Sequence, residues 1–151
     1  MTHPNEAYQQ WQARPEDFKL LERIPFTQKS AQWPLQLFDP VGDEIEMVIL
    51  DTETTGLSAA DDAIIELGMV KLMYSKSLNR ITSIEDVISV YEDPQRPISE
   101  FVTRLTGITD EMVKDQHIDS AWVAEWLSNK PLIVAHNAQF DRPFFEELFQ
   151  N

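Results

Sequence analysis

Two carboxylates stand one residue apart at the end of an apolar run in the segment MVILDTETTGL, residues 47–57. The run favours a β-strand, and alternate strand residues share a face, so Asp51 and Glu53 are expected to point the same way. Two like charges this close raise the pKa of one carboxyl strongly unless a cation lies between them. Carboxylate oxygens are the ligands that Mg²⁺ and Mn²⁺ prefer. The pair therefore indicates a divalent metal site.

An acidic strand end that faces solvent is the alternative explanation of this pair, because Asp and Thr are common in turns. On the two carboxylates alone, neither interpretation is favoured. The residues that follow, Thr54, Thr55 and Gly56, are small, and Gly56 permits a tight turn with free backbone N–H groups. Such a turn suits the end of an anionic substrate.

A third carboxylate decides in favour of the metal site. In the segment VAHNAQFDRPFFEEL, the spacing of Asp141, Phe144, Phe145 and Leu148 is that of one helix face. Asp141 is therefore predicted to lie on the core-facing stripe. A carboxylate on an apolar face needs a partner. An acid stabilised by the helix macrodipole is the simpler alternative, but it leaves the other two acids unexplained. We expect all three acids to be buried, which is costly without a counter-charge.

The elements that carry these residues predict an α/β domain with a mixed sheet and flanking helices. Three consecutive strands are expected to form a meander, and a later buried strand precedes the helix that holds Asp141. Predicted strands cover residues 45–53, 63–74, 80–91 and 131–136, and predicted helices cover residues 98–105, 110–114, 119–127 and 137–149.

Residues 1–44 differ in composition from residues 45–151, which we expect to form the main domain. The first segment contains two tryptophans and five of the nine prolines, Pro4, Pro15, Pro25, Pro34 and Pro40. We expect an irregular N-terminal arm with one short helix from about Pro15 to Arg23. Its aromatic residues either pack against the domain, which is the favoured interpretation, or form a partner-binding tail. These residues are Trp11, Phe18 and Trp33.

The overall composition excludes several classes of protein. With no cysteine, the chain has no disulfide, zinc–thiolate site or cysteine nucleophile. Twelve Lys and Arg against 26 Asp and Glu give a net charge of -14, the opposite of a protein that neutralises phosphates by itself. An anionic substrate would therefore need divalent cations. No signal peptide or membrane span is recognisable, so a cytoplasmic protein is expected.

Three motifs occur in an order that resembles a known family. The segments DTETTGL, LTGITDEMV and AHNAQFD resemble the front of the DEDD exonucleases, closest to the DEDDh subgroup typified by the proofreading epsilon subunit of bacterial DNA polymerase III. The resemblance extends from Glu44 to about Leu148. It implies a ribonuclease-H-like fold and hydrolysis of single-stranded nucleic acid from its 3′ end to nucleoside monophosphates. DNA is the favoured substrate and RNA the alternative. The resemblance also implies two Mg²⁺ or Mn²⁺ ions, and a polymerase or repair complex as a partner.

The same resemblance implies a role for each matching residue. Asp51 would bridge both metal ions, Glu53 would bind one ion and reach the terminal 3′-OH, and Asp141 would act on the second ion through water. The residues expected to surround the terminal nucleotide are Thr54, Thr55, Gly56, Leu57, Thr106, Gly107, Ile108, Asn137 and Phe140.

The chain departs from the family at the final motif, a His followed after four residues by an Asp, which supplies a general base and a fourth carboxylate. His136 and Asp141 have this spacing, but Asp141 is already the third carboxylate. We therefore expect His136 to be structural and His117 to lie in a loop. The favoured interpretation is a C-terminally incomplete, nearly inactive front part of an exonuclease. A nuclease-like binding or interaction module without catalysis is the alternative.

Overall fold

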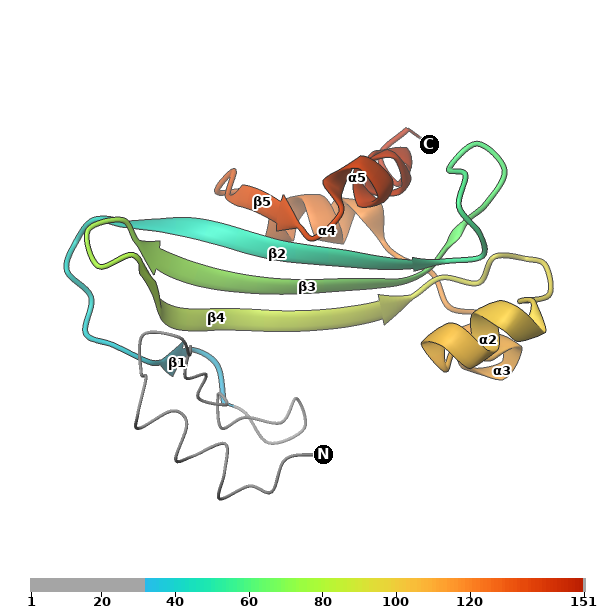
Figure 1. Cartoon of the computed structure of the whole chain (residues 1–151), viewed down its shortest axis with the longest axis horizontal. Coiled ribbons are helices and arrows are strands. Elements are labelled where there is room, and N and C mark those ends of the chain that lie inside the picture. The colour runs from blue at the N-terminus through green and yellow to red at the C-terminus, as the bar shows by residue number, and fades with distance from the viewer. Residues whose placement is uncertain (1–31, 151) are drawn as a thin grey trace, which may run out of the picture. The chain divides into compact units, whose positions relative to one another are not determined.

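The computed structural model describes residues 32–150, and these form one five-stranded sheet with helices packed around it (Figure 1). The predicted arm helix, Trp11 and Phe18 lie outside the described residues. The strands are β1 (Leu35–Gln36), β2 (Glu44–Thr54), β3 (Ile64–Ser75), β4 (Arg80–Tyr91) and β5 (Leu132–Ala135), and their order in the sheet is β1-β4-β3-β2-β5. The helices are α2 (Glu100–Thr106), α3 (Asp110–Val113), α4 (Ser120–Trp126) and α5 (Ala138–Glu147).

The sheet is mixed, as predicted. The strands β2, β3 and β4 form an antiparallel meander, and β5 pairs with β2 in parallel. Near the carboxyl end of β2 the register with β3 shifts: Glu53 lies opposite Glu66 whereas Thr54 lies opposite Ile64. Ile65 is therefore an extra residue in β3, a bulge that re-aims side chains at the end of the strand.

The main hydrophobic core lies on one face of the sheet. On β2 the buried residues alternate, as Val48, Leu50 and Thr52, and the helices α4 and α5 contribute to the same cluster. The members of this core are Val48, Leu50, Ile64, Leu67, Met69, Ile118, Val123, Phe144 and Phe145. The predicted apolar stripe of the last helix is confirmed, since Phe144 and Phe145 are both buried.

A second, smaller cluster connects α2 and α3 to the end of β3. Val102 of α2 and Val113 of α3 pack with Ile65, the bulge residue, and with Tyr91 at the end of β4. The helix α2 begins at the N-cap Ser99, whose side chain accepts from Val102 N, and ends at Gly107, where a φ of 79° favours glycine. Figure 1 shows α2 and α3 together beyond the ends of β3 and β4.

The last strand differs from its prediction. Residues 131–136 were expected to form a buried strand, but in β5 the side chains of Leu132, Ile133 and Val134 are 55%, 43% and 38% exposed. The reason is its position: within residues 32–150, β5 has a neighbour on one side only, the strand β2.

The first described residues approach the opposite edge of the sheet. Leu35 and Gln36 in β1 pair with Ile84 and Ser83 of β4. The division of the chain at residue 44 into an arm and a domain stays a prediction. No helix in residues 32–150 is both long and apolar enough to cross a membrane.

Candidate active site

The carboxyl end of β2 carries the first two predicted site residues. Asp51 and Glu53 lie on the strand face opposite the buried residues Leu50 and Thr52, so the prediction that both acids share a face is confirmed. The prediction that both are buried is wrong for Asp51, which is exposed, and Glu53 is half-buried. Ile49 on the same face is 43% exposed, because the main core lies on the other side of the strand.

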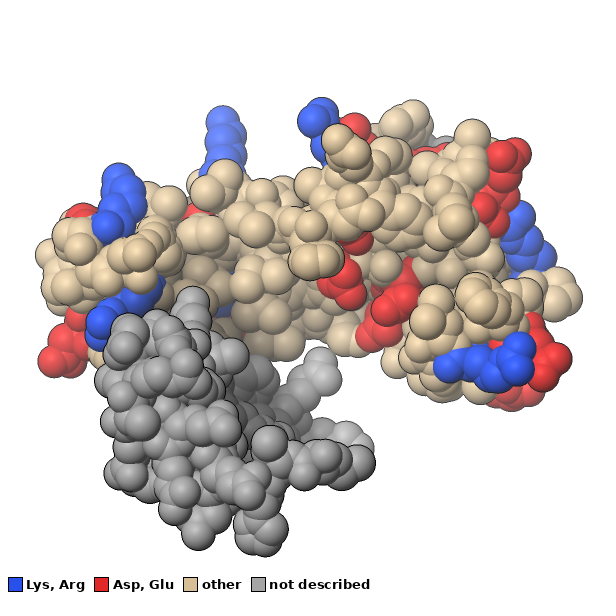
Figure 2. Space-filling model, viewed as in Figure 1, with Lys and Arg blue, Asp and Glu red and all other residues tan. Residues whose placement is uncertain are grey.

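The neighbouring strand adds an acid that sequence reasoning missed. Glu66 of β3 lies directly opposite Glu53, and it accepts a hydrogen bond from the hydroxyl of Ser89 on β4. The register of the hairpin was the signal that could have found it, because residues opposite one another share a face. Figure 2 shows Asp and Glu side chains gathered over the central strands, between α5 and the pair of helices α2 and α3.

The third predicted acid, Asp141, reaches the same end of β2 from α5. It is 3% exposed, and its Oδ1 accepts hydrogen bonds from Thr52 N at 3.1 Å and from Thr52 Oγ1 at 2.9 Å. The pairing of β2 with β5 ends at Leu50, opposite Ala135. Beyond this point β5 offers no acceptor to Thr52, and the carboxylate of Asp141 accepts from its backbone N–H instead. The prediction that Asp141 lies on the core-facing stripe and has a partner is confirmed.

The carboxylates disturb one another electrostatically. The pKa of Asp51 is raised, first by desolvation and then by the charges of Asp141 and Glu66, while His136 lowers it. The pKa of Glu53 is raised by desolvation, and then by Asp51, Glu66 and Asp141. Within the described part of the chain, neither Asp51 nor Glu53 accepts a hydrogen bond that would offset this repulsion. Both carboxylates are therefore in surroundings that a nearby cation would improve.

The donor set fits a hydrated divalent ion. Asp51 and Glu53 offer hard oxygen ligands and lack competing donors, which suits Mg²⁺ or Mn²⁺ with most of its waters retained. Among residues 32–150, no three His, Asp or Glu side chains are already arranged to hold an ion together, and one oxygen of Asp141 is occupied by Thr52. Asp141 would thus act on an ion through water more readily than by direct contact.

The turn after β2 lies beside these acids. Thr54 is buried and its hydroxyl donates to Gly56 O at 2.6 Å, which tightens the chain at the glycine. Leu57 follows with 87% of its side chain exposed. A cavity of about 260 Å³ brings Leu57 together with Asn137 and Phe140, two other residues expected to contact the terminal nucleotide.

The remaining predicted contacts lie at the end of α2. The hydroxyl of Thr106 donates to Val102 O and accepts from Ile108 N, and Gly107 is exposed. Ile108 is only 1% exposed and belongs to the second hydrophobic cluster, so its side chain supports this turn and does not line the cavity of Leu57.

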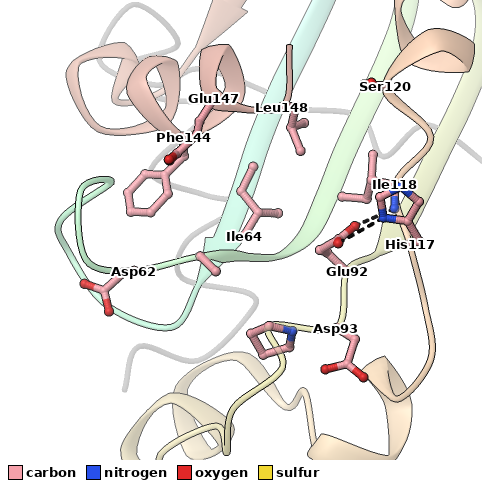
Figure 3. A pocket seen from close by; sticks show the side chains of 12 residues that line it. Asp62, Ile64, Glu92, Asp93, His117, Ile118, Ser120, Phe144, Glu147 and Leu148 are labelled. Atoms are coloured by element: carbon pink, nitrogen blue, oxygen red, sulfur yellow. Dashed lines mark hydrogen bonds and ion pairs between the residues drawn. The ribbon is translucent and has the colours of Figure 1, made fainter. Parts of the chain in front are cut away.

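A second cavity, of about 420 Å³, has Phe144 in common with the cavity of Leu57 (Figure 3). Asp62, Glu92, Asp93 and Glu147 contribute to its lining, and none of the predicted site residues does. His117 lies here, where its Nδ1 is 3.1 Å from Glu92 Oε1, so its expected loop position is confirmed. His136 follows β5 and is exposed.

The chain is similar to parts of large DNA polymerases. It is 42% identical over 105 residues to the DNA polymerase III PolC-type of Caldanaerobacter subterraneus subsp. tengcongensis, which covers 68% of this chain and 7% of that protein. It is 34% identical over 129 residues to the corresponding protein of Halalkalibacterium halodurans, covering 84% of this chain and 8% of the relative. The chain thus matches only a small part of these relatives' length.

Solved structures with the same fold belong to exonuclease I. The E. coli enzyme in complex with a dA16 oligonucleotide superposes with a TM-score of 0.52 at 18% identity, over 70% of this chain and 23% of that one. A zinc-bound complex of the same enzyme with single-stranded DNA has a TM-score of 0.53 at 19% identity, with the same coverage. The predicted ribonuclease-H-like α/β fold is confirmed. A family model described as exonuclease matches residues 48–149, more than half of the sequence, and the chain therefore belongs to the exonuclease family.

Proposed function

We propose that this chain forms the metal- and substrate-binding part of a 3′-to-5′ exonuclease that acts on single-stranded DNA and releases nucleoside monophosphates. The observation that supports the proposal is the electrostatic interaction of Asp51 and Glu53 on β2 with Asp141 on α5, which raises the pKa values of the first two. Leu57, Asn137 and Phe140, which line one cavity, are close in sequence to these acids. The acids and these lining residues come from two separate segments of the sequence, residues 51–57 and residues 137–141.

Each part of the site has a distinct task in this proposal. Asp51, Glu53 and Asp141 would hold two divalent ions, which would activate the attacking water and stabilise the leaving 3′-oxyanion. Phe140 and Leu57 would hold the terminal base between them without regard to its identity. The turn at Gly56 would receive the sugar and phosphate through its backbone N–H group.

DNA is the proposed substrate because the names of the relatives and of the fold neighbours refer to DNA or to DNA oligonucleotides. The relatives are DNA polymerases, and the exonuclease I structures include oligonucleotides such as dA16. A polymerase complex in the cytoplasm is accordingly the proposed context.

The test measures ion binding and digestion together. Titration calorimetry with Mn²⁺ on the wild-type chain should show weak binding, which Asp51→Asn should abolish. Asp39→Asn is the matched control, because Asp39 is exposed and lies near β1, at the other edge of the sheet. Equal heats for wild type and Asp51→Asn would leave only an acidic strand end and contradict the proposal.

A binding module without catalysis is the second candidate. It is favoured by the engagement of Asp141 with Thr52, which satisfies a buried carboxylate without any ion. Metal-dependent oligonucleotide binding with no release of mononucleotides, even at high enzyme concentration and with Mn²⁺ present, would support this candidate over the first.

A further inference from the structure

The loop between β2 and β3 is held by a residue from another part of the chain. Arg96, in the connection between β4 and α2, donates from Nη1 to Asp61 O at 2.7 Å and from Nη2 to Thr55 Oγ1 at 2.7 Å. The same Nη2 lies 3.4 Å from Asp62 Oδ1. One guanidinium therefore bridges the beginning and the end of the loop formed by residues 55–63.

The hydroxyl of Thr55 is completely used by this arrangement. It donates to Asp62 Oδ1 at 3.2 Å and accepts from Arg96 Nη2 and from Ala63 N, the latter at 3.1 Å. A hydroxyl has one donor and two acceptor sites, so Thr55 has no hydrogen-bonding freedom left. Its backbone N–H also donates to Ala63 O at 2.9 Å, which fixes both the main chain and the side chain of this residue.

The carboxylate of Asp62 lies inside the loop. Its Oδ2 accepts from Ser58 N at 3.1 Å, and a Cβ atom placed on Gly56 would lie 2.4 Å from the same oxygen. The backbone of Gly56 can approach the carboxylate this closely only because glycine has no side chain. The path of the chain at Gly56 therefore depends on where Asp62 is held, and Arg96 contributes to holding it.

We propose that Arg96 is a positioning residue for the substrate turn, acting through Thr55 and Asp62. Leu57 is 87% exposed, so its own packing does little to determine where it lies. The clasp, defined as Arg96, Thr55 and Asp62, instead determines the position of Gly56 and Leu57 beside the acids of β2. This inference rests on the proposed function, since it assigns the turn to the terminal nucleotide.

The geometry of the guanidinium separates this role from simple attraction of phosphate. Lysine keeps the charge but cannot bond Thr55, Asp61 and Asp62 at once, because it lacks the planar fork of arginine. Arg96→Lys and Arg96→Met should therefore weaken oligonucleotide binding to a similar extent, about tenfold for a misplaced turn. Arg80→Met is the matched control, because Arg80 starts β4 opposite Ser75, at the far end of β3 from the loop, and its guanidinium lies over the ring of Phe38.

The experiment measures three properties of the full 151-residue chain. The first is the anisotropy of a labelled oligothymidine of about 12 nucleotides with a phosphorothioate 3′ linkage, in Mg²⁺. The second is hydrogen exchange of the amides of residues 56–63, and the third is the heat of Mn²⁺ binding. Both Arg96 variants should bind the oligonucleotide about tenfold more weakly and exchange faster in the loop, with unchanged Mn²⁺ heats. Arg80→Met should match wild type.

Two results would overturn the inference. If Arg96→Lys binds the oligonucleotide as tightly as wild type while Arg96→Met binds weakly, the effect comes from the charge of Arg96 and not from its geometry. If hydrogen exchange in the loop is unchanged in both variants, the clasp does not hold the loop. If Arg96→Met does not fold, Asp62→Asn tests the same clasp and should weaken binding with Mn²⁺ heats unchanged. Absence of binding by the wild type itself contradicts the proposed function, so the two failures are distinguishable.

Discussion

At the scale of single residues, the proposed metal ligand Asp51 has a cost to the fold. Its pKa is raised above the ordinary value of 3.8 by desolvation and by the neighbouring acids Asp141 and Glu66. A carboxyl whose pKa is higher in the folded state destabilises that state wherever it is ionised, and this cost disappears below its unfolded pKa. A residue retained at such a cost is better explained by a ligand than by stability.

The first prediction follows from the upward direction of this pKa shift. Without divalent ions, Asp51→Asn should raise the melting temperature by about 1 to 3 °C near pH 7, a small gain because the carboxylate is exposed and screened. The gain should vanish as the pH falls below about 3.8, where the wild-type carboxyl is protonated in both states. Thermal unfolding across this pH range measures it. A gain that persists in acid would indicate a cause other than charge.

The second prediction concerns the general base. His136 is exposed, and its charge lowers the pKa of Asp51. A positioned general base contributes on the order of 10² to 10⁴ in rate. If His136 is not this base, the chain should digest a 3′-labelled oligonucleotide very slowly. His136→Ala should change that residual rate by less than about twofold. Rapid digestion abolished by His136→Ala would instead make the His136 and Asp141 pair catalytic.

At the scale of elements, a pair of hydrogen bonds to one carboxylate oxygen adds a buried polar link to the apolar packing of α5 on β2. Thr52→Val removes the hydroxyl bond to Asp141 and keeps the shape, and a lost bond to a buried carboxylate should cost about 1.5 to 3 kcal/mol of unfolding free energy. Thr82→Val is the control, because Thr82 is equally buried but donates at 3.3 Å to a neutral acceptor, Met73 O. Urea unfolding compares them, and equal losses would show that the Asp141 contact has no special weight.

The elements also show which features local pattern can predict. The meander of β2, β3 and β4 follows from alternation and turns within about 50 residues, and its predicted bounds agree closely with the observed ones. The exposure of β5 could not be predicted, because an apolar strand has the same composition whether one or both of its edges are paired. Glu66 and Arg96 required the pairing register and a contact between distant loops, neither of which periodicity contains.

At the scale of the whole molecule, the net charge of -14 opposes any bound nucleic acid. A protein that binds phosphates through its own lysines and arginines binds more weakly as salt rises, because counterions are released. Here Asp51, Glu53, Glu66 and Asp141 repel one another near the carboxyl end of β2, so a DNA end at the proposed site would meet negative charge. Binding should therefore depend on ions held by the protein.

The last prediction is that divalent cations tighten oligonucleotide binding beyond their contribution to ionic strength. At matched ionic strength, Mg²⁺ should lower the Kd for an unpaired 3′ end by about tenfold relative to Na⁺ alone, since an ion at Asp51 and Glu53 removes a repulsion of a few charges at short range. Asp51→Asn should lose most of this dependence, whereas Asp39→Asn should keep it. Anisotropy titrations measure both.

Blunt duplexes should bind more weakly than single strands of any sequence, because stacking on Phe140 requires a free base and not a particular one. An equal Kd in Mg²⁺ and Na⁺, or a preference for duplex, would contradict a site in which bound ions and a free 3′ end act together.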